Sequence, residues 1–401
     1  MKTHRYTSII LSVILLVTSI VLSFILAKED NKVIMNNNEI TTSIISDNEE
    51  MRGLWVSYIS LDMTGTDRSF DDFKERFTEI LSKAKELGCN TLIVQVRPFC
   101  DALYKSEIFP YSHVLSGTQG VDCGYDALEY MCKEAHDEGI KIHAWINPYR
   151  VSTGSIPSTL SNNNPFVQAE TVGFKTDTGI YLDPCKKAVR KLIRDGVAEI
   201  VNNYDVDGIQ FDDYFYPSDC EKFDIEDFNA YRKATGNIAT AMEYDEWRMN
   251  NVNLMISGVY QTIKAIKPDV VFGISPQGNI DNNAGIFADI YTWCQAEGYI
   301  DYICPQMYFS TNHPNVSFEE MLIRWNKISM HRNLNVYIGL GVYKAGTDAD
   351  NGTWLESSEI LATQLSMLRQ HGYDGYMLYD YNAVCSETAD KELEAFCSEI
   401  D

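Results

Sequence analysis

The sequence predicts a (β/α)8 barrel, and three observations lead to this fold class. From Gly53 onward, short apolar segments typical of strands alternate with amphipathic segments typical of helices, eight times over. The links from each helix to the next strand are short and turn-like, whereas several links from strand to helix are long. Long loops on one face are expected where the carboxyl ends of barrel strands carry a site. An open doubly wound sheet is the alternative, but no GxGxxG motif follows the first strand.

Eight segments have the length and apolar content of buried parallel strands. In chain order they span residues 53–58, 91–97, 140–147, 208–212, 270–275, 302–306, 335–340 and 375–379. Between them, Val189, Ile193, Val197 and Ile200 recur at helical spacing, as do the apolar residues between 252 and 266. The long strand-to-helix links follow the second, third and fourth strands and span residues 98–124, 148–183 and 213–242.

The N-terminal segment differs from the rest of the chain. Lys2, His4 and Arg5 precede an uncharged apolar run over residues 6–27, which is about as long as a bilayer-spanning helix. We predict that residues 1–27 form an uncleaved signal-anchor, a single transmembrane helix in the cell membrane, with a cleaved signal peptide as the alternative. Residues 28–50 are polar and predict a flexible linker. Residues 51–401 then form the barrel domain, outside the cytoplasm in either case.

The composition excludes several classes of function. The chain has 401 residues, and 33 Lys+Arg against 57 Asp+Glu give a net charge of −24, so we expect no nucleic-acid partner. No P-loop, dinucleotide fingerprint, CxxC or HExxH occurs, so we expect neither a cofactor nor a metal. The ten cysteines are scattered and predict mostly buried thiols. Cys100 and Cys123 bracket one loop and are the first pair to test for a disulfide.

Polar side chains are expected at the carboxyl ends of the strands. Successive side chains along a strand point to opposite faces of the sheet. If the apolar side chains face the helices, the side chains between them face the barrel axis. The inward positions are then Gln95, Arg97, His143, Trp145, Asn147, Gln210, Asp212, Ser275, Gln277, Gln306, Tyr308 and Tyr379. A barrel filled only for stability would carry Val, Ile and Leu there. The sequence therefore predicts one functional cleft, lined by Arg97, Asn147, Asp212, Gln306 and Tyr308.

The residues near this cleft are typical of a glycosidase, which needs acid and base carboxylates beside aromatic platforms. Its carboxylates are Asp101, Asp183, Asp212, Asp213, Asp281 and Asp380. Seven segments carry a family resemblance: RGLWV at 52–56, QVRP at 95–98, DALY at 101–104, HAWINPYR at 143–150, DGIQFDDYFYP at 207–217, ISPQGN at 274–279 and PQMY at 305–308. Over about residues 51–385 the chain resembles the glycosyl hydrolase-like 10 family. The resemblance implies a (β/α)8 barrel, a bacterial cell-envelope setting and action on peptidoglycan glycan strands stripped of their stem peptides.

The adjacent carboxylates Asp212 and Asp213 resemble a pair in O-GlcNAcase-type and hexosaminidase-type barrels. That resemblance implies that Asp212 holds the 2-acetamido group, whose oxygen attacks the anomeric carbon, and that Asp213 protonates the leaving oxygen. Tyr308 resembles the Tyr of the Met-x-Tyr motif in chitinase-type barrels, which supports the acetamido group. The chain departs from the chitinase pattern because Tyr214 stands where an acidic Glu would fall. Two carboxylates this close should also differ in pKa.

The candidate catalytic residues are Asp212 and Asp213, and further residues are candidates for binding substrate. These are Arg97, Asp101, Trp145, Asn147, Tyr149, Gln210, Gln277, Gln306, Tyr308 and Asp380. Arg97 would bind a substrate carboxylate or neutralise a nearby Asp. Trp145 and Tyr149 would stack on sugar rings or pack the mouth, and Asp380 would hold sugar hydroxyls or cap the next turn.

The predicted function is hydrolysis of N-acetylated cell-wall glycan by an extracytoplasmic, membrane-tethered glycoside hydrolase, with substrate assistance by the acetamido group. Two alternatives stay open. One is a retaining two-carboxylate glycosidase on a neutral polysaccharide, with Asp212 as nucleophile and Asp281 or Asp380 as acid. The other is a non-catalytic barrel that binds glycan.

Overall fold

The computed structural model describes residues 49–217, 222–236, 238–328 and 334–400. One compact unit begins at Glu50. The predicted signal-anchor at 1–27 and nearly all of the predicted linker at 28–50 lie outside the described residues. Within the described ranges, no helix combines the length and the apolar character that crossing a bilayer requires.

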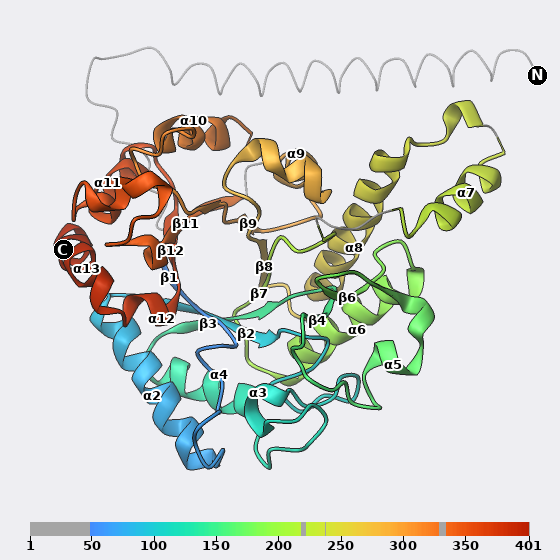
Figure 1. Ribbon diagram of the computed structural model, residues 1–401, viewed down its shortest axis with the longest axis horizontal. Helices are drawn as coiled ribbons and strands as arrows, with labels where there is room; N and C mark the ends of the chain where they lie inside the picture. Colours follow the sequence, from blue (N-terminus) through green and yellow to red (C-terminus); the bar gives the residue numbers. More distant parts are fainter. Residues whose placement is uncertain (1–48, 218–221, 237, 329–333, 401) are drawn as a thin grey trace, which may run out of the picture. The chain divides into compact units, whose positions relative to one another are not determined.

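The described unit is built on a closed ring of parallel strands, which confirms the predicted barrel and excludes an open doubly wound sheet (Figure 1). The strands are β1 (Met51–Val56), β2 (Thr91–Arg97), β3 (Lys141–Ile146), β7 (Gly208–Phe211), β8 (Val271–Ile274), β9 (Tyr302–Ile303), β10 (Gln306–Met307), β11 (Asn335–Gly341) and β12 (Gly375–Tyr379). β9 and β10 are two parts of the sixth strand, since both pair with β11. Pro305, which has no N–H to donate to the ladder, lies between them.

Helices surround the ring (Figure 1). Their apolar residues are buried in one cluster with those of the strands. The main ones are α2 (Phe70–Glu86), α4 (Ala127–Asp137), α6 (Lys187–Asn203), α8 (Tyr244–Ile266), α9 (Ile290–Gln295), α10 (Phe318–Ile328), α11 (Ile360–Gln370) and α13 (Asp390–Ile400). Both predicted helical runs lie in α6 and α8. Shorter helices lie in the loops: α3 (His113–Ser116), α5 (Pro165–Gln168), α7 (Ile225–Ala234) and α12 (Tyr381–Val384).

The long loop after β3 contains structure that the sequence pattern did not reveal. β4 (Arg150–Thr153), β5 (Gly173–Lys175) and β6 (Gly179–Leu182) form a small antiparallel sheet beside the barrel mouth. These strands are three or four residues long, too short to show a period of their own. The thiols of Cys100 and Cys123, the first pair proposed for a disulfide, are not joined.

The barrel interior is aromatic and polar rather than aliphatic. Its apolar cluster consists of Met51, Trp55, Ile93, Trp145, Tyr302, Cys304, Tyr337 and Met377. The hydroxyl of Tyr302 donates to Gln210 Oε1 and lies 3.0 Å from both that atom and His143 Nδ1. The predicted orientation toward the barrel axis is therefore confirmed for the side chains of His143, Trp145 and Gln210. His143 is a buried structural residue of this layer, and burial lowers its pKa to about 4.

The Tyr302 ring occupies space that only a glycine leaves open. A Cβ on Gly273 of β8 would lie 2.1 Å from two atoms of that ring. We therefore expect Gly273→Ala to lower the free energy of unfolding by about 1–3 kcal/mol, the usual cost of overpacking a core. Denaturant unfolding followed by tryptophan fluorescence measures this change. Gly285→Ala is the matched control, because no described atom beyond the adjoining chain lies within 4 Å of the added Cβ; equal losses in both variants would contradict the prediction.

Candidate active site

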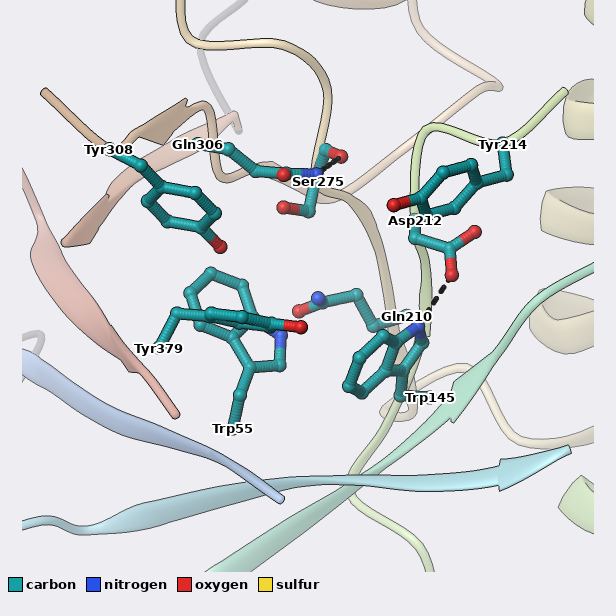
Figure 2. Close-up of a pocket in the computed structure, with 9 residues that line it drawn as sticks. All are labelled: Trp55, Trp145, Gln210, Asp212, Tyr214, Ser275, Gln306, Tyr308 and Tyr379. Carbon is teal, nitrogen blue, oxygen red and sulfur yellow. Dashed lines mark hydrogen bonds between the residues drawn. The ribbon is translucent and has the colours of Figure 1, made fainter. Parts of the chain in front are cut away.

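A pocket opens at the carboxyl ends of β1, β3, β7, β8, β10 and β12 (Figure 2). It is lined by Trp55, Trp145, Gln210, Asp212, Tyr214, Ser275, Gln306, Tyr308 and Tyr379. Its cavity volume is about 40 Å³, and it is open to solvent. Tyr214 lies at its rim and is 55% exposed.

Asp212 follows the last residue of β7 and is 4% exposed. Its Oδ2 accepts hydrogen bonds from Trp145 Nε1 at 3.0 Å and from Asn147 Nδ2 at 3.2 Å. Its Oδ1 is buried and has no hydrogen-bond partner among the described residues. Burial raises the pKa of Asp212 to about 7; the positive charge of Arg150 opposes this shift, and the negative charge of Asp213 adds to it. Asp212 is thus a carboxyl group that exchanges a proton near neutral pH.

Asp213 is also 4% exposed, but its environment differs. Gln306 Nε2 donates to its Oδ1 at 3.0 Å, and Gln277 Nε2 donates to its Oδ2. Burial raises its pKa, while the two amide donors oppose the shift because they stabilise the charged form. The strand ladder ends at Phe211, so strict alternation no longer applies at Asp213. The carboxylate of Asp213 turns to the amides of Gln277 and Gln306, beside the pocket that Asp212 lines.

An aromatic wall faces Asp212 across the pocket (Figure 2). The rings of Tyr308 and Tyr379 stack with centroids 5.2 Å apart and an interplanar angle of 28°. Trp55 meets both rings edge-on, at 6.4 and 5.7 Å. Tyr308 therefore lies in the pocket as predicted, as do Trp145, Gln210 and Gln306, while Asn147 and Gln277 contact the carboxylates.

The predicted position of Arg97 is wrong. The register of β2 against β3 shifts between Gln95 and Arg97, and this bulge turns Arg97 away from the barrel axis. Its guanidinium lies 4.4 Å from the centre of the Phe109 ring, and a Cβ on Gly196 of α6 would lie 2.4 Å from its Nη1. Arg97 therefore packs between β2 and α6, where substrate cannot reach it.

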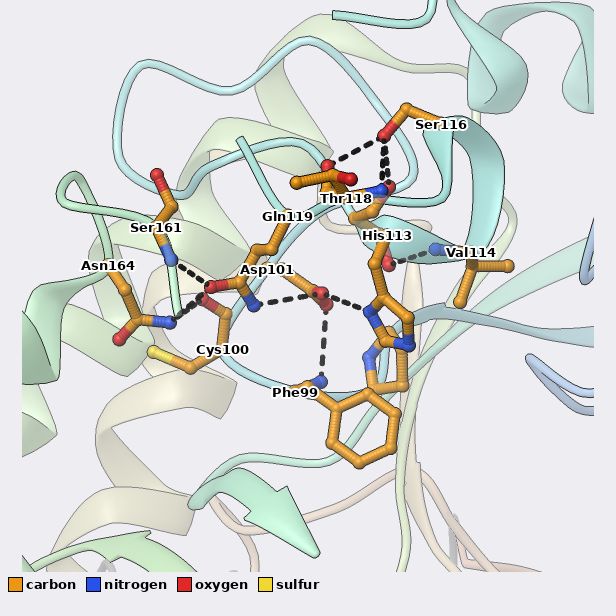
Figure 3. A network of polar contacts seen from close by, with 12 residues as sticks. Phe99, Cys100, Asp101, His113, Val114, Ser116, Thr118, Gln119, Ser161 and Asn164 are labelled. Carbon is orange, nitrogen blue, oxygen red and sulfur yellow. Dashed lines mark hydrogen bonds and ion pairs between the residues drawn. The ribbon is translucent and has the colours of Figure 1, made fainter. Parts of the chain in front are cut away.

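Asp101 also does not line the pocket. It lies in a network of polar contacts between loops (Figure 3). Its fully buried carboxylate accepts from the backbone N–H of Phe99 at 3.2 Å and from Gln119 Nε2 at 3.1 Å, and it lies 3.4 Å from His113 Nδ1. Gln119 in turn accepts from the loop after β3 through Asn164 Nδ2. Asp101 thus holds two loops of the mouth together, and its predicted contact with substrate is wrong.

Two further predicted substrate contacts have structural roles. Tyr149 is completely buried and packs edge-on against Phe215, so it offers no face to a sugar. Asp380 caps α12, since its Oδ1 accepts from the backbone N–H of Ala383 at 3.2 Å, and its Oδ2 accepts from Ser57 Oγ at 3.1 Å. For Asp380, the capping alternative is therefore the correct one.

Two other carboxylates named from the sequence also lie away from the pocket. Asp281 forms an exposed ion pair with Arg324 at 2.6 Å. Asp183 lies with Cys185 and Asp227 in a group whose ligand atoms are close enough to hold a metal ion. The ammonium of Lys186 lies 2.7 Å from Asp227 and already supplies a positive charge there. None of these residues lines the pocket around Asp212.

Arg150 is the functional candidate that sequence reasoning missed. The backbone N–H of Arg150 donates to Asn147 Oδ1 at 2.9 Å, which brings it back over the mouth. Its Nε donates to the Pro98 carbonyl at 3.0 Å, and its guanidinium lies 4.8 Å from the Phe99 ring centre and 5.6 Å from that of Tyr214. Arg150 is the last residue of the segment HAWINPYR. It lies beyond the end of the predicted strand, so the alternation of side chains along that strand could not indicate where it points. Arg150 supplies at the mouth the positive charge that was expected from Arg97.

Comparison with known proteins places this barrel in a family. Residues 50–355 match the model for the family described as Glycosyl hydrolase-like 10. The chain belongs to the glycosyl hydrolase-like 10 family. It is 32% identical to Glycosyl hydrolase YngK of Bacillus subtilis over 80% of this chain and 66% of that protein. It is 33% identical to Glycosyl hydrolase DigH of Escherichia coli K12 over 74% of each.

Solved structures share the fold of this glycosyl hydrolase-like enzyme at low sequence identity. The glycoside hydrolase domain of PgaB (BpsB) from Bordetella bronchiseptica aligns with a TM-score of 0.58 at 13% identity, covering 87% of this chain and 99% of that one. The C-terminal domain of a putative chitinase from Desulfitobacterium hafniense aligns with a TM-score of 0.51 at 11% identity, covering 88% and 100%. At such identities these likenesses show the fold alone.

Proposed function

We propose that the chain is an extracytoplasmic glycoside hydrolase that cleaves N-acetylated glycan strands of bacterial peptidoglycan. The observation that carries the proposal is the pair Asp212 and Asp213. One carboxyl group presents an unpartnered oxygen at a pocket that is lined by aromatic rings, and the other is held by two amides. Family membership supports the reaction class, and the apolar run at 6–27 supports a location outside the cytoplasm.

The environments of the two carboxyl groups favour a division of roles opposite to that of the hexosaminidase-type barrels. Both side-chain donors to Asp212 bind Oδ2, whereas Oδ1 has no hydrogen-bond partner among the described residues, so Oδ1 is the better site for a proton. Its pKa of about 7 suits a general acid, which must be protonated in part at the working pH. Asp213 receives an amide on each oxygen and is the better candidate for the charged form. We assign Asp212 as proton donor and Asp213 as the anion that stabilises positive charge.

The proposed reaction balances without a cofactor. The acetamido oxygen attacks the anomeric carbon, the glycosidic C–O bond breaks, and the proton of Asp212 passes to the leaving oxygen. An oxazolinium ion forms, and Asp213 stabilises its charge. Water then adds at the anomeric carbon and gives a proton to Asp212, while the bond between that carbon and the acetamido oxygen breaks, so the acetamido group is restored. Tyr308 and Tyr379 shield the forming ring from solvent.

The two-carboxylate alternative has less support from the geometry. Its two proposed acids have other partners. Asp281 forms an ion pair with Arg324, and Asp380 caps α12. Neither carboxylate lines the pocket that holds Asp212.

The decisive experiment is digestion of purified sacculi, with and without prior amidase treatment, followed by mass spectrometry of the released sugars. We expect soluble N-acetylated fragments with new reducing ends, and more of them after the stem peptides are removed. Glycan retention without new reducing ends would support a binding module instead. In the host cell, external protease should cleave residues 51–401 of the membrane-bound chain; a soluble cytoplasmic chain would contradict the location.

Arg150 would bind a carboxylate on the substrate, such as the lactyl group of a muramic acid residue without its peptide. We expect Arg150→Gln to raise KM for such strands about tenfold, the effect of losing one charge-assisted hydrogen bond. It should also move the alkaline limb of the pH profile upward, because the charge of Arg150 lowers the pKa of Asp212.

Kinetics on peptide-free strands and on N-acetylglucosamine chains without lactyl groups test both effects of Arg150→Gln. The KM for the uncharged chains should not change. Arg324→Gln is the matched control, because it removes another arginine that lies away from the pocket. An equal loss on both kinds of chain would contradict a carboxylate site.

A further inference from the structure

A second exposed aromatic side chain stands on the rim of the pocket. Tyr343 lies in the single 3-10 turn Val342–Lys344 that follows β11, and it is 47% exposed. Its ring meets Tyr308 at 5.8 Å and 90° and Tyr379 at 6.1 Å and 81°. Two edge-to-face contacts hold the ring in one orientation, while much of its surface remains open to solvent.

Tyr343 and Tyr214 lie on different sides of the mouth. Tyr214 follows β7, and Tyr343 follows β11. These two strands are not neighbours in the ring. On one side they are separated by β8 and by the divided strand that consists of β9 and β10. On the other side they are separated by β12, β1, β2 and β3. The pocket with Asp212 lies between the two tyrosines, because Tyr308 and Tyr379 contact Tyr343 while Tyr214 itself lines the pocket.

An exposed ring in a fixed orientation suits the apolar face of a pyranose. Ring stacking buries apolar surface on both partners, and a ring held by its neighbours loses little conformational freedom when it binds. Tyr343 does not line the pocket itself, so a sugar on it would be a neighbour of the sugar in the pocket.

We propose that Tyr343 is a stacking platform for a sugar residue adjacent to the one whose bond is cleaved. This inference rests on the proposed function and extends it. With Arg150 and Tyr214 on the other side, the mouth holds a sugar on each side of the sugar in the pocket. A strand that continues past the pocket in both directions is cleaved within its length rather than only at its ends.

The test compares Tyr343→Ala with Tyr343→Phe, which keeps the ring. Tyr291→Ala is a matched control, because Tyr291 is 49% exposed and lies in α9, outside the pocket around Asp212. The probes are peptide-free glycan strands of defined length and an aryl N-acetylglycosaminide that fills only the pocket. Calorimetric affinity for the strands, KM for both probes and the sizes of the early products are measured.

We expect Tyr343→Ala to weaken strand affinity and raise KM for strands about tenfold, with the aryl glycoside unaffected. Tyr343→Phe and Tyr291→Ala should behave as the unmodified chain, which should release fragments of mixed length. Unchanged strand affinity in Tyr343→Ala, or release of terminal units alone, would overturn the inference. If the unmodified chain bound strands without cleaving them, the proposed function would fail; the affinity of Tyr343→Ala would still decide whether Tyr343 binds sugar.

Discussion

Asp212→Asn is expected to lower kcat on natural glycan about 100- to 10,000-fold, the usual cost of losing one positioned acid–base group. The amide cannot donate the carboxyl proton, although it keeps the size and the polarity of the side chain. Activated aryl glycosides, whose leaving groups need no protonation, should lose far less activity. Steady-state kinetics over a series of leaving-group pKa values measures this difference. Asp281→Asn, which alters an exposed carboxylate away from the pocket, should leave kcat unchanged.

The pH profile gives a second measurement of the same role. An acid must be protonated to act, so kcat should fall as pH rises above about 7, the pKa of Asp212. This alkaline limb should disappear in Asp212→Asn. If Asp213→Asn were the variant that recovers activity with good leaving groups, the roles of the two carboxylates would be those of the hexosaminidase-type barrels.

Replacing the substrate's N-acetyl group with a free amine is expected to abolish most of the activity. A tethered nucleophile is worth a large effective concentration, so its removal should cost on the order of 1,000-fold or more in kcat. A thiazoline that mimics the cyclised sugar should bind at least about 100-fold more tightly than substrate, because it resembles the charged state that the site stabilises. Rates on matched acetylated and deacetylated strands and an inhibition constant test both expectations.

The opposite result identifies the alternative mechanism. A fluorinated substrate that leaves a covalent sugar on Asp212, together with no inhibition by the thiazoline, would show a two-carboxylate retaining glycosidase. If the chain bound both the acetylated and the deacetylated glycan strands but formed no new reducing ends, it would be a non-catalytic barrel.

The barrel could be predicted because its signals are local and repeated. Each of the eight strands carries its own apolar segment, and each predicted segment overlaps a strand of the ring. The alternation of side chains was also enough to place Trp145, Gln210 and Asp212 at the mouth. These predictions need only the period of a strand and the short connections between neighbours.

The orientation of Arg97 could not be predicted, because a bulge changes the face of the sheet to which the following side chain points. The sequence pattern of β2 does not reveal where this bulge lies. Tyr149 and Asp380 could not be assigned either. Burial against Phe215 and capping of α12 depend on how loops fold back on the barrel. Arg150 was missed for the same reason, since its place over the mouth depends on contacts with Asn147 and Pro98.

The sequence by itself determined the fold class, the family resemblance and the position of two adjacent carboxylates at the end of the fourth barrel strand. Only the tertiary structure decided how these carboxylates differ. The donors to Asp212 come from Trp145 and Asn147, 67 and 65 positions earlier in the chain, and those to Asp213 come from Gln277 and Gln306. A pKa depends on burial and on the charged and polar groups within a few ångströms. Residues that lie so far apart in the chain become neighbours only because the barrel closes, and the local sequence does not show this.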